Sequence, residues 1–287
     1  MKRRRLFPVY IGFILVIMYI PILLVIVYSF NHSRLSSVWS GFSLYWYAEL
    51  FRDRSMFEAL RNSLVLGLLT SLCAAVIGTL GASGMARALE TSSKGLVAGS
   101  RSASAARIAG SGFGKTMEYL SILPIMTPEI ILGMVFLAFF SLLALPFGML
   151  TLVIAHTAFC VPYVYLLVRA RLAGLEKSYV EAARIMGASD MRAFWDITLP
   201  LVLPAVISGM LISFAMSFDD VIISVFVAGV DTNTLPMKIY SQIKTGVTPK
   251  TNAMCTLIFI MTVILCIASA ALAGRNLRRK ALKRVSR

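Results

Sequence analysis

Apolar residues occur along the chain in long runs, separated by shorter polar or charged segments. A helix that crosses a membrane needs about 20 mainly apolar residues, because each residue advances the helix by ~1.5 Å. Six stretches meet this requirement, some of them with polar interruptions. They cover residues 8–30, 62–86, 118–143, 148–168, 201–229 and 253–273. The pattern predicts an all-α membrane protein with six transmembrane helices, forming one membrane domain over about residues 60–270.

The segments between these stretches differ in composition. The loop 31–61 has five aromatic residues between positions 39 and 47, which is typical of a helix at the headgroup level or packed over an outer mouth. Residues 87–117 are basic and rich in Gly, Ser and Ala, which predicts a mobile linker. A second outer loop is expected at 230–252, and a basic tail at 274–287.

The proportions of apolar and charged residues exclude two classes of protein. The sequence is 58% hydrophobic and 14% charged, whereas soluble domains carry roughly 25% charged residues. A single water-soluble domain and a disordered chain are therefore excluded. The net charge of +15 would ordinarily suggest nucleic acid as a partner.

The position of the basic residues explains this charge differently. With six spans both ends of the chain lie on one side, and that side holds 21 of the 28 Lys and Arg residues. The positive-inside rule then places both termini in the cytoplasm. The charge reflects membrane topology, so no nucleic-acid partner is expected.

Cofactor and metal chemistry have little support in the sequence. The four cysteines lie in apolar stretches without metal-ligand spacing. Residues 109–116 (AGSGFGKT) approach the phosphate-binding pattern G-x-x-x-x-G-K-[ST]. The preceding run SASAARIA is not a strand, and a phosphate-binding loop needs a strand before it and a helix after it. We therefore expect no ATP hydrolysis by this chain, no catalytic residue, no cofactor and no metal.

The hydrophilic loop 169–200 has a pattern of its own. Residues 175–186 fit a helix with its larger apolar side chains on one face, and Gly187 can end that helix. A short amphipathic stretch over 191–197 follows, and Pro200 begins the next apolar helix. We expect a helix–Gly–helix element on the cytoplasmic side, with small residues that let a partner surface approach closely.

Within this loop the pattern E-A-A-x-x-x-G-x9-I-x-L-P is met in full, and it resembles the signature of permease subunits of bacterial ABC importers. The resemblance implies the type I importer permease fold, and a coupling helix that docks on a separate ATPase subunit. We call residues 169–200 the EAA loop. The ATPase-coupling residues that the resemblance implies are Glu181, Ala182, Ala183, Gly187, Ile197, Leu199 and Pro200.

A narrower resemblance extends along nearly the whole chain except the linker. The runs YSFN (28–31), SFDD (217–220), TLPM (234–237) and NA (252–253) resemble spermidine/putrescine importer permeases of the C type. This resemblance implies a second, related permease, two ATP-binding subunits and an external polyamine-binding protein. It also implies the bacterial inner membrane as location, and transport by alternating access. The linker is longer and richer in Gly and Ser than is usual in that family.

Three carboxylates lie inside the predicted spans, namely Glu129, Asp219 and Asp220. An ionisable group in a membrane is costly, and is therefore a candidate for function. A polyamine suits spaced carboxylates and aromatic faces, and Tyr163 and Phe218 could supply such faces. We expect these five residues to be candidates for the substrate path. His156 is expected to be a hydrogen-bonded packing residue.

Two alternatives remain open at this point. One is an ABC importer permease for another small solute, such as ferric ion or thiamine. The other is an ion-coupled secondary transporter, although the internal repeats usual in such folds are not evident between the two halves of the chain.

Overall fold

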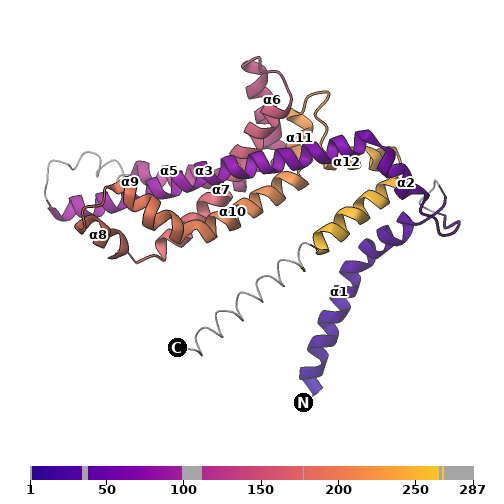
Figure 1. Ribbon diagram of the computed structural model, residues 1–287, viewed down its shortest axis with the longest axis horizontal. Helices are drawn as coiled ribbons and strands as arrows, with labels where there is room; N and C mark the ends of the chain where they lie inside the picture. Colours follow the sequence, from indigo (N-terminus) through magenta and orange to yellow (C-terminus); the bar gives the residue numbers. More distant parts are fainter. Residues whose placement is uncertain (1, 34–37, 99–111, 177, 265–266, 268–287) are drawn as a thin grey trace. The chain divides into compact units, whose positions relative to one another are not determined.

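The computed structural model describes residues 2–33, 38–98, 112–176, 178–264 and 267 (Figure 1). Within these ranges the chain is helical apart from turns, loops and one isolated β-bridge between Asn31 and Phe42. It divides into two compact units. One is formed by Met1–Phe57 with Ile239–Arg287, and the other by Glu58–Lys238.

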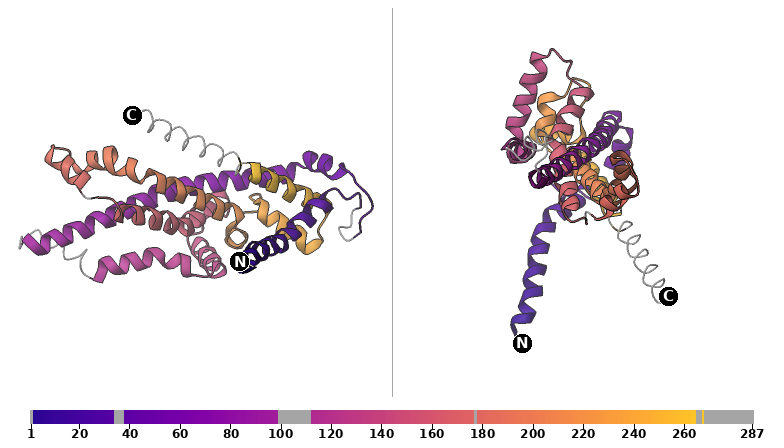
Figure 2. Two further views of the ribbon diagram at one scale, coloured as in Figure 1. Left: turned by 90° about the horizontal axis from the view of Figure 1, so that it is seen from below. Right: turned by 90° about the vertical axis from the view of Figure 1, so that its left-hand side faces the viewer.

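The unit Glu58–Lys238 is a bundle of long apolar helices with a loop structure at one end. The long helices are α3 (Arg54–Ala98), α7 (Met149–Ala173) and α10 (Leu199–Asp219). Shorter helices are α5 (Gly112–Met126), α6 (Glu129–Leu142), α8 (Ser178–Ile185), α9 (Asp190–Ala193), the π-helix η1 (Phe194–Thr198) and α11 (Ile222–Val227). The core lies where α3, α7 and α10 pack along one another (Figure 2).

Glycines let these three helices approach closely around Val164 of α7. A Cβ added to Gly78 of α3 would lie 2.8 Å from the Val164 Cβ, and one added to Gly209 of α10 would lie 3.0 Å from the Val164 Cα. Close approach through small residues is how membrane helices gain packing energy, since lipid tails are as apolar as the side chains. Helices α3 and α10 therefore both pack closely against Val164 of α7.

Two of the predicted spans are interrupted. The stretch 118–143 contains α5 and α6, separated at Thr127 and Pro128, where proline cannot donate a backbone hydrogen bond. The stretch 201–229 contains α10 and α11, separated at Asp220, whose backbone is extended (φ −67°, ψ 132°). The halves that follow the two breaks, α6 and α11, lie side by side (Figure 1).

The unit containing the N-terminus is built from α1 (Lys2–Ser29), α2 (Tyr45–Arg52) and a helix over Pro249–Ile264. The helix α12 (Leu235–Thr245) leads into it. The Asn31 amide organises the loop after α1, donating to the Val38 carbonyl at 2.7 Å and accepting from the Ser40 N–H at 2.9 Å. From Tyr10 to Tyr28 no residue of α1 is buried, so in a membrane this helix faces lipid or another subunit.

Among the residues that the structure describes, four helices are long and apolar enough to cross a membrane. They are Tyr10–Ser29, Arg54–Arg87, Met149–Ala173 and Asp190–Asp219, and two shorter apolar helices are Glu129–Leu142 and Pro249–Ile264. These six helices fall within or overlap the six predicted stretches. The number of crossings and the placement of the termini remain predictions. In the predicted linker, α3 continues to Ala98 and α5 begins at Gly112, while 99–111 lie outside the described residues.

Candidate functional site

The first half of the EAA loop is α8, and it ends at Gly187. Gly187 has φ +87°, a left-handed conformation that glycine adopts without strain. The Gly187 N–H donates to the Arg184 carbonyl at 3.0 Å, and the Ala188 N–H donates to the Ala183 carbonyl at 2.9 Å. These bonds satisfy carbonyls that a helix C-terminus would otherwise leave open. The motif glycine therefore sets the direction of the chain after α8.

Side chains then fix the second half of the loop against the first. The Arg184 Nε donates to the Asp190 Oδ1 at 2.8 Å, which joins α8 to α9 across the Gly187 turn. Ser189 caps α9, since its hydroxyl accepts from the Arg192 N–H. We infer that α8, the turn and α9 form one block.

The π-helix η1 connects this block to α10. Single π-turns are rare and occur frequently at functional sites. Of the motif residues, Ile197 lies in η1, Leu199 begins α10, and Pro200 lies in its first turn, where the missing N–H costs little. The structure thus places all seven motif residues in one continuous segment, from α8 to the first turn of α10.

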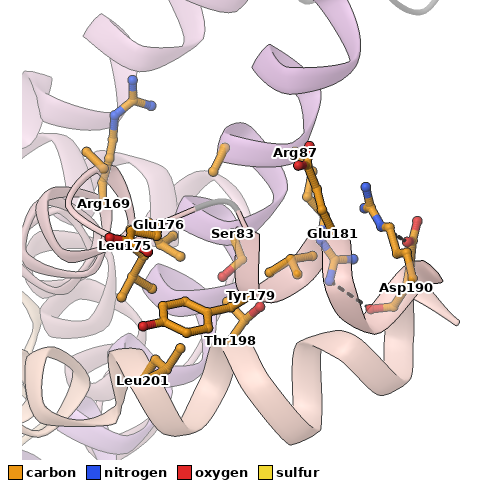
Figure 3. A pocket seen from close by; sticks show the side chains of 15 residues that line it. Ser83, Arg87, Arg169, Leu175, Glu176, Tyr179, Glu181, Asp190, Thr198 and Leu201 are labelled. Carbon is orange, nitrogen blue, oxygen red and sulfur yellow. Dashed lines mark hydrogen bonds and ion pairs between the residues drawn. The ribbon is translucent and has the colours of Figure 1, made fainter. Parts of the chain in front are cut away.

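A pocket of about 390 Å³ lies between this element and the ends of α3 and α7 (Figure 3). Glu181 of the motif lines it, together with Arg87 of α3, Arg169 of α7 and Tyr179 of α8. The Ser83 hydroxyl at the pocket is buried and has no hydrogen-bond partner among the described residues. The pocket therefore combines polar groups from α3, α7 and α8 with apolar side chains such as Leu172, Leu175 and Leu201.

The EAA loop exposes large apolar side chains among charged ones. Ile185 is 85% exposed and Met186 is 87% exposed, on either side of the end of α8. Met191 and Trp195 are also exposed on the second half of the loop. Large exposed apolar side chains on a loop outside the apolar helices are typical of a protein-binding surface.

A second group of candidate residues lies where the two interrupted spans break. Glu129 is the first residue of α6, Asp219 the last of α10, and Asp220 caps α11. Helix α6, which begins at Glu129, packs against α11, which follows the two aspartates, and Tyr163 lies on the neighbouring α7. We call Glu129, Asp219 and Asp220 the carboxylate cluster. The structure brings these predicted residues, from spans far apart in the sequence, into one region.

The two aspartates of the cluster have different surroundings. Asp220 is buried, and its carboxylate accepts the Ile223 N–H at 3.2 Å and the Ser224 N–H at 2.8 Å, which caps α11. It also accepts the Ser224 hydroxyl at 2.9 Å. Asp219 is exposed. Of the two aspartates, Asp219 is therefore the one whose carboxylate is accessible in this conformation.

His156 joins the same region from α7. Its Nδ1 lies 2.8 Å from the Ser217 Oγ, and its Nε2 lies 3.1 Å from the Ser224 Oγ and 3.4 Å from the Asp220 Oδ2. The sequence correctly suggested a hydrogen-bonded residue, but its partners were not visible because they lie 61 to 68 positions away.

The two aromatic candidates are only partly buried, and each packs against another ring. Phe218 stacks on Phe214 with ring centroids 5.8 Å apart, and Tyr163 meets Phe159 edge-on at 5.7 Å. Sequence reasoning missed Arg87, Ser217 and Ser224. The two serines flank the Asp219–Asp220 pair, and this arrangement was the signal that could have identified them.

Sequence relatives are permeases of known transport systems. The putrescine transport system permease protein PotI of Escherichia coli K12 is 38% identical over 248 residues, which cover 84% of this chain and 81% of PotI. The spermidine/putrescine transport system permease protein PotC is 35% identical in Escherichia coli K12, over 89% of both chains. The Haemophilus influenzae PotC is 34% identical over 90% of this chain and 93% of that protein.

Solved structures agree on the fold. A chain of a bacterial ABC transporter that imports the acidic polysaccharide alginate has a TM-score of 0.66 at 15% identity, covering 96% of this chain and 98% of that chain. A chain of the methionine ABC transporter MetNI, in inward-facing conformations, has a TM-score of 0.54 at 18% identity, covering 76% of this chain and 95% of that chain. The fold is that of ABC importer permeases.

The family comparison covers the EAA loop and the carboxylate cluster together. Residues 95–283 match the family "Binding-protein-dependent transport system inner membrane component". The chain is thus a multi-pass permease subunit of the inner membrane, and ATP hydrolysis falls to a separate subunit. On these grounds, the chain belongs to the family of inner membrane components of binding-protein-dependent transport systems.

Proposed function

We propose that this chain is a permease subunit that moves polyamines such as putrescine and spermidine through the membrane by alternating access. The observation that supports this most is the carboxylate cluster, which gathers at the two helix breaks inside an otherwise apolar bundle. Polyamines are chains of ammonium groups joined by methylenes, so their path needs negative charge with apolar surface between. The names of the sequence relatives support the same substrate class.

The break after α10 adds to the attraction for cations. The C-terminal end of a helix carries about half a negative charge, because its last carbonyls have no intrahelical partner. Asp219 is the last residue of α10, so its carboxylate and these carbonyls act at the same place. Discontinuous membrane helices bind cations in this way in other transporters. We assign Asp219 the direct substrate contact, with Glu129 as a second carboxylate and Tyr163 and Phe218 as aromatic neighbours.

The EAA loop is the proposed docking site for the ATPase. Its exposed apolar side chains suit a cleft on a partner, and the Gly187 turn and the Arg184–Asp190 ion pair hold the tip in a fixed conformation. Six spans from one chain do not enclose a path, so a second related permease completes it. Two ATP-binding subunits at the cytoplasmic face and an external polyamine-binding protein complete the proposed complex.

Transport by the reconstituted complex tests this proposal. Proteoliposomes containing this chain with its partner permease, ATPase and binding protein are supplied with labelled putrescine and spermidine. We expect ATP-dependent uptake by the wild type. Glu181→Lys should abolish uptake because the ATPase no longer docks in register. Asp219→Asn should lower uptake by about tenfold, since one charge contact of ~1–2 kcal/mol is lost, and ATP hydrolysis should remain.

Three results would contradict parts of the proposal. ATPase stimulation by a different solute, with no polyamine uptake, would keep the importer and exclude the substrate. Polyamine uptake driven by an ion gradient without ATP would keep the substrate and exclude the ATP-driven mechanism. Unchanged uptake in Asp219→Asn would remove Asp219 from the path.

A further inference from the structure

The EAA loop is joined to α7 and α10 through the backbone and to α3 through side-chain contacts. It continues directly into α10, and it follows α7 along the chain. Helix α3 is not directly connected to the loop through the backbone, since Arg87, which contacts the loop, is 103 positions away from Asp190. A movement of the loop therefore reaches α7 and α10 through the backbone, but it reaches α3 only through side-chain contacts.

Arg87 makes two contacts with the second half of the EAA loop. Its Nη2 donates to the Asp190 backbone carbonyl at 3.0 Å, at the start of α9. Its guanidinium also lies over the Phe194 ring, 5.4 Å from the centroid, at the start of η1. Hydrogen bonds from a charged donor are stronger than neutral ones, and a guanidinium over a ring face adds a cation–π attraction. The two contacts hold both elements of the loop's second half.

Other contacts near Arg87 also connect the EAA loop with α3. Helix α8 faces α3 across the 390 Å³ pocket, whose wall also includes Arg87 and Ser83 (Figure 3). The ion pair between Arg184 and Asp190 ties α8 to the residue whose carbonyl Arg87 binds. The whole block of α8, turn and α9 is thus connected to α3 at the edge of a cavity.

Arg87 also marks the end of the membrane part of α3. The apolar span runs from Arg54 to Arg87, and Gly67 and Gly78 within it pack closely on Phe214 of α10 and on Val164 of α7. A displacement applied at Arg87 is therefore transmitted along a continuous, tightly packed helix.

We propose that Arg87 is a positioning residue that links α3 to the EAA loop, so that ATP-driven movement of the loop moves α3 together with α7 and α10. This inference rests on the proposed docking of the ATPase at the EAA loop. Without the link, the ATPase still docks and hydrolyses ATP, but α3 follows only through its packing on α7 and α10, so that less of the movement is transmitted to it.

The first test measures the number of ATP molecules hydrolysed per solute imported by the reconstituted complex. Arg87→Met removes the charge and both contacts while keeping the length of the side chain. We expect this ratio to rise about tenfold, within the usual range of coupling between sites, while the ATPase remains bound and active. Arg87→Lys keeps the charge but not the planar fork, so its ratio should lie between the two. Arg169→Met is the matched control, since Arg169 lines the same pocket but bonds to Tyr165 of its own helix.

The second test requires no knowledge of the transported solute. Spin labels on cysteines replacing Met85 of α3 and Met191 of α9, in a background without native cysteines, report the distance between the two elements. We expect an unchanged, narrow distance distribution on ATP binding when Arg87 is present, and a broad or shifted one in Arg87→Met. This result separates the link from the substrate, because it holds even if polyamines are not imported.

Several outcomes would overturn the proposal. An unchanged ratio in Arg87→Met would show that α3 follows the loop without this contact. Loss of the ATPase from the purified complex would make Arg87 a docking residue. A change in the label distance on ATP binding in the presence of Arg87 would show that α3 and α9 move separately.

Discussion

His156 is held by hydroxyl groups from both sides of the break between α10 and α11. The Ser224 hydroxyl donates to the Asp220 carboxylate, so its oxygen accepts from the His156 Nε2–H. The other ring nitrogen, Nδ1, then accepts from the Ser217 hydroxyl. This chain of hydrogen bonds joins α7 to the end of α10 and the start of α11. We infer that it fixes the angle of the break, and with it the position of Asp219.

Replacing His156 tests this inference. His156→Leu should destabilise the protein by about 1–2 kcal/mol, because buried polar groups lose partners while polar contacts between membrane helices contribute modestly. Thr157→Val is the matched control at the next position, since the buried Thr157 hydroxyl has no partner among the described residues. Thermal unfolding of the detergent-purified protein should show a loss for the first variant and almost none for the second. Equal effects would contradict the network.

Replacing Gly78 tests the close packing of α3 against α7. Gly78→Ala should cost about 1–3 kcal/mol, because the new methyl group would overlap Val164 and push α3 away from α7. Gly84→Ala lies on the same helix with nothing within 4 Å, so it should be neutral or more stable by up to ~1 kcal/mol. The yield and thermal stability of the two variants measure the difference. Similar stability in both would mean that α3 can shift at no cost.

At the scale of elements, the sequence predicted the EAA loop more fully than the spans. Gly187 and Pro200 are local signals, and both act within a few residues, so the turn and the start of α10 could be predicted. Pro128 was also visible, and the interruption at Glu129 follows from it. The break at Asp220 has no proline. It depends on the hydrogen bonds that the Asp220 carboxylate accepts from Ser224, and on His156 of α7, which bonds to the same serine.

Contacts between elements were the part that the sequence could not supply. The carboxylates were recognised because charge inside an apolar run is unusual, but their meeting place depends on how α6 packs against α11. The link from Arg87 to Asp190 joins residues whose neighbours in the sequence give no indication of each other. Such pairs need the tertiary structure, or co-variation between related sequences.

At the scale of the whole molecule, the orientation in the membrane follows from the distribution of basic residues, and exposed side chains allow it to be tested. Met186, at the tip of the EAA loop, is 87% exposed, and Val230, after α11, is 93% exposed. The chain crosses the membrane once between them in the predicted topology, through α10 and α11. Cysteines at these two positions should therefore be equally reactive but on opposite sides.

The measurement uses intact cells and a membrane-impermeant thiol reagent, with the four native cysteines replaced. We expect Val230→Cys to be labelled from outside, and Met186→Cys to be labelled only after the cells are permeabilised. The physical reason is that 21 of the 28 basic residues lie on the Met186 side, and the positive-inside rule retains that side in the cytoplasm. Labelling of both cysteines from outside would mean that α10 and α11 do not cross the membrane. Reversed labelling would place the EAA loop outside, where no ATPase could reach it, and would exclude the coupling mechanism together with the topology.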